Sequence, residues 1–251
     1  MANSKALKAM AAGAAAIASL AIGGAAMAQA VIIRSTGPSA AQYPQGRKLP
    51  ANATVTLKSG DRVTVLDKSG TRVLSGPGSF AMNGKVNRDG EGTSLASAIL
   101  SSGSSRRTRT GAVRGAPVEQ APPGPGSVWY IDVSKGGTYC VADPSKLVLW
   151  RPNRTEEATA TLTAADGTVA DLVWKRGNAL KLWPAATLPV VDGQTYTFSD
   201  PVGPAVKITT RLLGPLPPDP MEVAAKMGEL GCNAQLDVMA NAAAPAGSGG
   251  M

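Results

Sequence analysis

Residues 157–175 read EATATLTAADGTVADLVWK, and this stretch decides the fold class. Two β-prone runs, 157–162 and 169–175, flank the pair Asp166-Gly167. Glycine takes the positive φ that a tight hairpin turn demands at little steric cost. The stretch therefore predicts an antiparallel β-hairpin.

Further short strands surround this hairpin at spacings of about ten residues. Turn signals such as Gly136-Gly137 and Arg176-Gly177-Asn178 separate them. We expect the other strands at 128–133, 138–142, 147–150, 179–183, 195–198 and 205–212. This pattern predicts an antiparallel β-sandwich over residues 127–240.

A helix is expected to close the sandwich. Asp219 is a suitable N-cap, and Pro220 fits the first helical position. Apolar residues then recur at helical spacing, namely Val223, Met227, Leu230, Ala234 and Val238. Because Gly228 and Gly231 each weaken a helix by about 1 kcal/mol, we expect a break near Gly231 into two short helices.

Residues 31–86 predict a second, smaller β module. Val31-Ile32-Ile33 is a β-branched start, and residues 54–58 alternate apolar and polar side chains as a half-buried strand does. Tight turns are expected at Gly60, at Gly70 and at residues 76–78. Four or five short strands joined in this way form a β-meander or a small barrel, so the whole fold is expected to be mainly β.

This small module carries a recognisable pattern. It consists of Leu57, Gly60-Asp61, Val63, Val65, Gly70-Thr71 and Val73, followed by Gly-Pro-Gly-Ser-Phe at 76–80. Residues 53–80 thereby resemble the FecR-type periplasmic β-domain, and are similar to exported proteins of alphaproteobacteria that end the module in the same way. FecR-type proteins relay signals through a transmembrane helix and a cytoplasmic anti-sigma region. We expect neither part here, so the resemblance implies no signalling mechanism.

Residues 1–30 have the character of a cleavable export signal. Two lysines precede an apolar run at 11–26, and no acidic residue occurs. The run is short and weakly hydrophobic for a membrane anchor. The small-x-small patterns at 26–28 and 28–30 predict cleavage after Ala28 or Ala30. No second apolar span follows, so we expect a periplasmic protein with no transmembrane span in the mature chain.

Export makes a disulfide the expected state of Cys140 and Cys232. Closing this loop of 92 residues contributes about 4–5 kcal/mol in the chain-entropy model. The alternative is that both are small buried hydrophobic side chains. A catalytic cysteine would lack a histidine to activate it.

Residues 87–126 predict a flexible linker rich in Gly, Ser, Arg and Pro, with one or two helical turns at 93–100. Four arginines cluster there, Arg106, Arg107, Arg109 and Arg114. The net charge of +8 falls to +6 without the two leader lysines and to +2 without these arginines. The cluster either attracts anionic envelope components or is a solvated linker. Residues 241–251 predict a disordered tail.

The composition excludes several kinds of catalyst. The chain has no histidine, which excludes Ser-His-Asp triads, Cys-His dyads and histidine-ligated metals. Two cysteines are too few for a four-thiolate metal site, and no nucleophile elbow, phosphate loop or dinucleotide fingerprint occurs. The adjacent pairs Ser134-Lys135 and Ser145-Lys146 would point to opposite faces of a strand. We therefore expect no cofactor, no metal and no catalytic residue.

Four tryptophans belong to the predicted sandwich, Trp129, Trp150, Trp174 and Trp183. They either fill its core or line a carbohydrate site. Together these features predict an exported, non-enzymatic envelope accessory or scaffold protein that binds a protein partner through a sheet edge or the sandwich surface. The alternatives are a small-molecule or glycan-binding β module and a histidine-independent hydrolase. Nucleic acid is not expected as a partner.

Overall fold

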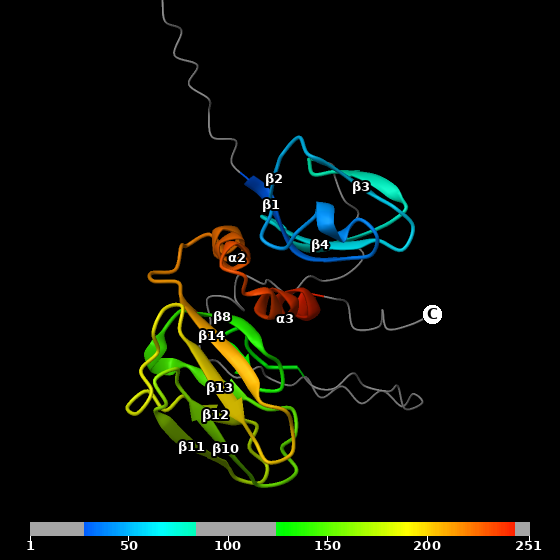
Figure 1. Cartoon of the computed structure of the whole chain (residues 1–251). Coiled ribbons are helices and arrows are strands. Elements are labelled where there is room, and N and C mark those ends of the chain that lie inside the picture. The colour runs from blue at the N-terminus through cyan, green and yellow to red at the C-terminus, as the bar shows by residue number, and fades with distance from the viewer. Residues whose placement is uncertain (1–27, 84–123, 244–251) are drawn as a thin grey trace, which may run out of the picture.

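The computed structural model describes residues 28–83 and 124–243 (Figure 1). Strands dominate both stretches and two helices follow the last strand, so the mainly β fold class is confirmed. The leader, the linker arginines, the helical turns at 93–100 and most of the predicted tail lie outside the described residues. None of the helices described is long and apolar enough to cross a membrane.

The N-terminal module, residues 28–83, has two antiparallel sheets. One has the strand order β2-β1-β4-β5, and the other pairs β3 with β6. Its elements are β1 (Ala28–Thr36), the 3-10 turn η1 (Ala40–Gln42), β2 (Lys48–Pro50), β3 (Thr54–Leu57), β4 (Arg62–Asp67), β5 (Gly70–Ser75) and β6 (Gly78–Ala81). Apolar side chains from both sheets, among them Ile32, Val55 and Val65, form one core.

Strand β1 pairs with β2 and β4 along its two edges, and its side chains are buried on both faces of the sheet. Ala30 and Ile32 belong to the core of the N-terminal module. Val31 and Ile33 belong to a second core on the other side of the sheet. All four side chains are 0% exposed. Such a strand requires a continuous apolar run instead of alternation, which explains the sequence Ala-Val-Ile-Ile.

The C-terminal sandwich, residues 124–214, packs a five-stranded sheet on a three-stranded sheet. Their strand orders are β11-β10-β13-β14-β8 and β12-β9-β7. The elements are β7 (Tyr130–Asp132), β8 (Gly137–Val141), the 3-10 turn η2 (Pro144–Lys146), β9 (Val148–Trp150), β10 (Ala158–Thr163), β11 (Val169–Trp174), β12 (Leu180–Leu182), β13 (Thr195–Ser199) and β14 (Val206–Leu212). Side chains of both sheets share one core, so the predicted sandwich is present.

Two strand pairs depart from the predicted antiparallel arrangement. β14 pairs with β8 in parallel, and so does β7 with β9. The reason is a crossover, because β8 follows β7 in the chain but belongs to the opposite sheet. It joins the five-stranded sheet at the edge beside the last strand, β14. The remaining pairs of the sandwich are antiparallel.

Helices α2 (Pro220–Glu229) and α3 (Asn233–Ala243) follow the sandwich, with the predicted break between them. The Asp219 carboxylate accepts a hydrogen bond from the N–H of Met221 at 2.9 Å, which confirms the N-cap. The predicted apolar face is right in α2, but in α3 it holds only in part, because Ala234 packs against the sandwich core and Val238 is only half-buried. Gly231, at φ +77°, interrupts the helix, so the residues of α3 do not continue the helical repeat of α2. As a result α3 buries Leu236, Met239 and Ala240 in place of Val238.

The helix pair lies between the two β modules (Figure 1) and shares one core with both. Besides the helices, this core contains Val31, Ile33 and Leu66 from the N-terminal module and Val128, Trp129, Cys140 and Leu213 from the sandwich. The backbones of α2 and the N-terminal module come close together at two glycines. A Cβ atom placed on Gly228 would lie 2.2 Å from the Cα of Gly46. The helices therefore join the modules instead of covering the sandwich alone.

Candidate functional site

The hairpin of β10 and β11 forms one end of the five-stranded sheet. Its turn depends on Gly167, which has a φ of +87°. The N–H of Ala164 donates to the carbonyl of Thr168 at 2.8 Å, and the N–H of Gly167 donates to the carbonyl of Ala164 at 3.1 Å. Hydrogen bonds from Thr168 to the Asp166 carboxylate lower the pKa of that carboxyl. The predicted Asp-Gly hairpin is therefore confirmed.

Strand β11 is paired on one side only. In an antiparallel pair, residues alternate between positions that bond the neighbour and positions that face away from it. The hydrogen bond between Ala164 and Thr168 shows which residues of β11 face β10. Counting in steps of two from Thr168, residues 170, 172 and 174 bond β10. The backbone N–H and C=O groups of Val169, Asp171 and Val173 consequently face the open edge. No other strand of the described residues is paired there.

The side chains of these three residues are also exposed. Val169 is 49% exposed and Val173 is 43% exposed. Asp171 lies between them, and no cation of the described residues forms an ion pair with it. We call the outward backbone groups and side chains of Val169, Asp171 and Val173 the β11 edge.

A shallow groove of about 540 Å³ lies beside the β11 edge, on the outer face of the sheet. Most of its lining surface is apolar, and both polar and apolar residues contribute, namely Thr159, Thr161, Ser199, Asp171 and Asp200 together with Ala160, Leu172, Val173 and Pro201. Such a lining offers both hydrogen-bond donors and acceptors next to exposed apolar surface. The edge and the groove together form a continuous candidate binding surface.

The inner face of β11 anchors this surface. Leu172 and Trp174 are buried in the sandwich core, and the Trp174 ring meets Phe198 edge-on at 6.1 Å between centroids. The buried Arg151 guanidinium lies 5.7 Å from the centre of the Trp174 ring. Its Nε donates to the carbonyl of Asn178 at 3.2 Å, and burial lowers its pKa. The β11 edge is thus presented on a packed support.

The opposite end of the same sheet is covered. Gln235 of α3 is 1% exposed and bonds the outer side of β8. Its Oε1 accepts from the N–H of Cys140 at 2.6 Å, and its Nε2 donates to the carbonyls of Cys140 at 3.0 Å and Val128 at 2.8 Å. The side chain thus takes the place of a neighbouring strand, which is one way of protecting a sheet edge.

The predicted disulfide joins Cys140 and Cys232, with the Cα atoms 5.7 Å apart. Cys140 lies on β8, and Cys232 lies in the turn between α2 and α3. Both residues are buried. The bridge and Gln235 therefore attach the helix pair to the same strand, which assigns the two cysteines a structural role.

The four tryptophans all lie in the core, none more than 9% exposed. They are therefore not available as a stacking platform for a sugar. The hydroxyls of Ser134 and Ser145 donate to Asp132 and Asp143, each at 2.6 Å, and not to the neighbouring lysines. Lys135 and Lys146 instead form ion pairs with the same two carboxylates. Both Ser-Lys pairs are thus parts of local turns.

The Gly-Asp pair of the FecR-type pattern also shapes a turn. Gly60 has a φ of +82° between β3 and β4. The buried Asp61 carboxylate accepts the N–H groups of Ser39 at 2.8 Å and Lys58 at 2.6 Å. Burial raises the pKa of Asp61, but these hydrogen bonds outweigh it, and the pKa lies below its ordinary value. The pair therefore ties two loops of the module together.

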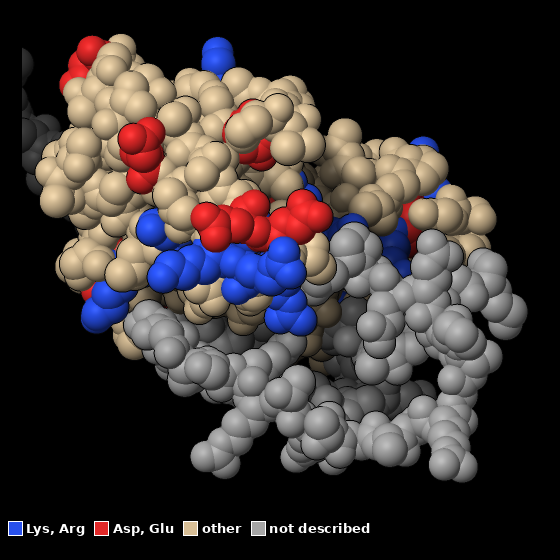
Figure 2. Space-filling model, turned by 90° about the horizontal axis from the view of Figure 1, so that it is seen from below, with Lys and Arg blue, Asp and Glu red and all other residues tan. Residues whose placement is uncertain are grey.

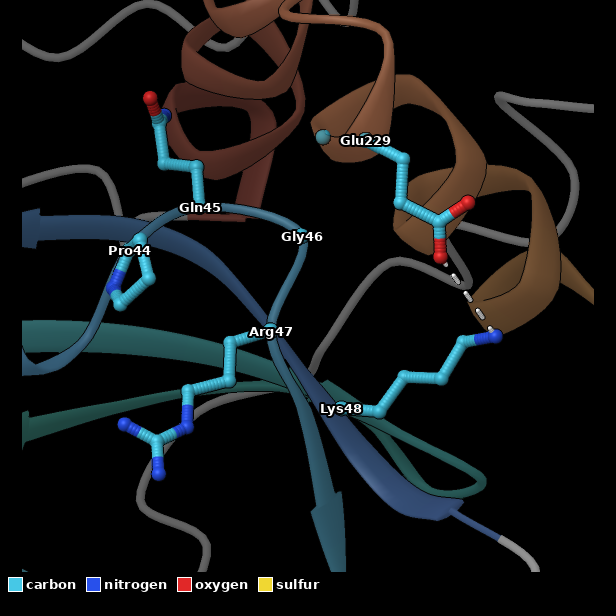
Figure 3. Close-up of a pocket in the computed structure, with 7 residues that line it drawn as sticks. Pro44, Gln45, Gly46, Arg47, Lys48 and Glu229 are labelled. Carbon is cyan, nitrogen blue, oxygen red and sulfur yellow. Dashed lines mark ion pairs between the residues drawn. The ribbon is translucent and has the colours of Figure 1, made fainter.

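A second cleft, of about 420 Å³, lies at the joint between the modules (Figure 3). Loop 44–48 and the end of α2 line it, and Gln45 and Arg47 point to opposite sides of the loop. Lys48 Nζ lies 3.9 Å from the Glu229 carboxylate. Because the glycine contact between Gly46 and Gly228 forms part of its wall, we assign this cleft to the packing of α2.

The predicted anion-binding arginines, Arg106, Arg107, Arg109 and Arg114, lie outside the described residues. On the face drawn in Figure 2, a row of basic side chains lies directly beside a group of acidic side chains. Within residues 28–83 and 124–243, no cluster of three metal-ligating side chains occurs.

Comparison of the chain with protein-family models, with curated proteins and with solved structures finds no match.

Proposed function

We propose that this chain is an exported envelope protein that acts by binding an extended segment of a protein partner along the β11 edge. The β11 edge carries the proposal, because three successive outward residues combine free backbone groups with exposed side chains. A partner strand gains main-chain hydrogen bonds at such an edge, and side-chain contacts add selectivity. The protein would be a binding or scaffold component and not an enzyme.

The side chains of the edge define the partner's chemistry. Residues directly opposite in a sheet contact each other across the strands. Val169 and Val173 favour aliphatic residues in the partner, and Asp171 favours a lysine or arginine between them. The expected segment therefore alternates aliphatic, basic and aliphatic residues on one face. Each favourable cross-strand pair contributes about 0.2–1 kcal/mol.

The location in the envelope rests on other observations. The leader-like residues 1–30 support export, and the disulfide between Cys140 and Cys232 suits an oxidising compartment. The likeness of residues 53–80 to FecR-type periplasmic domains supports the same location. We therefore place the partner segment in the periplasm, on a secreted or membrane-anchored protein.

A charge-swap experiment tests the proposal. The probe is a seven-residue peptide in which threonines alternate with valine, lysine and valine, and a second peptide has glutamate in place of lysine. Affinity is measured by NMR titration of the folded chain. The wild type should prefer the lysine peptide by up to about fivefold, since 1 kcal/mol is worth this factor. Asp171→Lys should reverse the preference.

The matched control is Glu157→Lys, which changes the net charge equally at an exposed position before β10. It should leave the preference for the lysine peptide unchanged. If both peptides bind equally to the wild type and to Asp171→Lys, or if the shifts lie away from β11, the proposed edge is wrong.

A second candidate follows from the groove beside the β11 edge. Thr159, Thr161 and Ser199 offer hydroxyl groups suited to a polar small molecule such as a glycan. Titration with short oligosaccharides would then shift the amides of Thr161 and Ser199. Tryptophan fluorescence is a poor reporter here, because all four indoles are buried.

A further inference from the structure

We infer that the exported chain begins at Gln29, by hydrolysis of the Ala28–Gln29 peptide bond. The inference rests on the export that forms part of the proposed function. The two small-x-small patterns at 26–28 and 28–30 leave two bonds open to a signal peptidase. The fold distinguishes between the two resulting chains.

Ala30 is an integral part of β1. It pairs with Leu49 of β2 on one side and with Asp67 of β4 on the other. Its side chain is 0% exposed and belongs to the core of the N-terminal module. Cleavage after Ala30 would remove this residue from a strand that has neighbours on both sides.

Cleavage after Ala30 would also place a positively charged amino group at a buried position. The new α-ammonium group would belong to Val31, which is 0% exposed and pairs with Lys48 and Leu66. An α-amino group is largely protonated at neutral pH, and burying an unpaired charge is costly. The same group on Gln29 lies one residue before the buried Ala30.

The step itself is an ordinary hydrolysis. Water adds to the carbonyl carbon of Ala28, the C–N bond to Gln29 breaks, and the two products carry a carboxylate and an amine. The peptidase acts on the unfolded chain, so both bonds are accessible to it. The Gln29 product keeps the buried Ala30 and Val31 within β1, and loses only Ala28 of that strand, which pairs with Pro50.

The first residue of the mature chain can be identified directly. The full chain is expressed in a bacterium that exports through signal peptidase, and the N-terminal peptide of the protein from the periplasmic fraction is identified by mass spectrometry. The expected start is Gln29, as glutamine or as its cyclised pyroglutamate form. A start at Val31 overturns the inference but leaves export intact. Intact chain from Met1 in the cytosol overturns export, and the inference with it.

Two variants within the leader test further which peptide bond is cleaved. Ala26→Leu places a large residue at the third position before the Gln29 cleavage site, and should abolish the Gln29 start. Met27→Leu changes the tolerant middle position and should leave that start unchanged. Both substitutions lie before Gln29, so neither is present in a chain that starts at Gln29. A Gln29 start that persists in Ala26→Leu contradicts the assignment.

A comparison of stability tests the physical reason. Two chains, one starting at Gln29 and one at Val31, are prepared with the disulfide formed and unfolded in urea. The Val31 chain should unfold at a clearly lower urea midpoint. Equal midpoints would show that Ala30 and the position of the ammonium group do not matter, and would overturn the inference.

Discussion

Replacing Gly228 by alanine tests whether α2 packs directly on the N-terminal module. In an isolated helix this change stabilises by about 1 kcal/mol. Here the added Cβ would lie 2.2 Å from the Cα of Gly46 and 2.8 Å from the carbonyl oxygen of Gln45. Carbon atoms prefer separations of about 3.5–4.0 Å, so the backbones must separate by roughly 1.5 Å. Both obstructing atoms are backbone, and no side chain can rotate away.

Overpacking of this kind costs typically about 1–3 kcal/mol. A clash between two backbones should cost about 3 kcal/mol, at the upper end of this range. The higher helix propensity of alanine offsets about 1 kcal/mol of this cost. We therefore expect Gly228→Ala to lower the free energy of unfolding by about 2 kcal/mol. Urea unfolding followed by circular dichroism measures this difference. Glu229→Ala, next to it but largely exposed, should change stability by no more than about 0.5 kcal/mol. A Gly228→Ala variant as stable as the wild type would refute the close contact.

Three further predictions concern the same framework. Gln235→Leu should cost about 3 kcal/mol in urea unfolding, because it leaves buried backbone groups beside β8 unpaired; a loss below about 1 kcal/mol would contradict the role of this side chain. Replacing both Cys140 and Cys232 by serine should cost about 4 kcal/mol, and an unchanged midpoint would argue against the bridge. Asp61→Asn should be less stable than the wild type at neutral pH. Because the folded-state pKa of Asp61 lies below 3.8, its contribution is present above 3.8 and is lost as the pH falls through the folded-state pKa, so the two melting curves should converge in acid. Glu157→Gln serves as the exposed control, and a gap that does not change with pH would contradict the assignment.

Local features of the fold were predictable because each depends on a few adjacent residues. The hairpin follows from the positive φ of Gly167, and the start of α2 follows from the Asp219 side chain, which accepts the N–H of Met221. The break near Gly231 follows from the weak helix propensity of glycine and from the positive φ that Gly231 adopts. In each case the physical cause lies within one turn of chain.

Other features depend on residues far apart in the chain. The apolar pattern shows that α2 has a face to bury, but not that Val31 and Ile33 of β1 cover it. Gly228 reads in sequence as a residue that weakens a helix, and only the contact with Gly46 explains it. Gln235 is a polar residue with no local signal that it would be buried.

The candidate site likewise depends partly on local sequence and partly on residues far apart in the chain. A sheet edge was expected to bind a partner, but strand order decides which strand lies at an open edge. The parallel pairing of β8 with β14 places β8 at one end, where α3 covers it. The other end falls to β11, whose sequence Val-Ala-Asp-Leu-Val-Trp is an ordinary half-buried strand in isolation.

Amide hydrogen exchange of β11, followed by NMR, tests the central claim most directly. In the free protein the amides of Val169, Asp171 and Val173 should exchange rapidly, while those of residues 170, 172 and 174 should be protected by their bonds to β10. Saturation with the valine-lysine-valine peptide should slow the three outward amides and leave the inner ones unchanged. Equal protection of all six amides in the free protein, or no slowing with the peptide bound, would contradict the account.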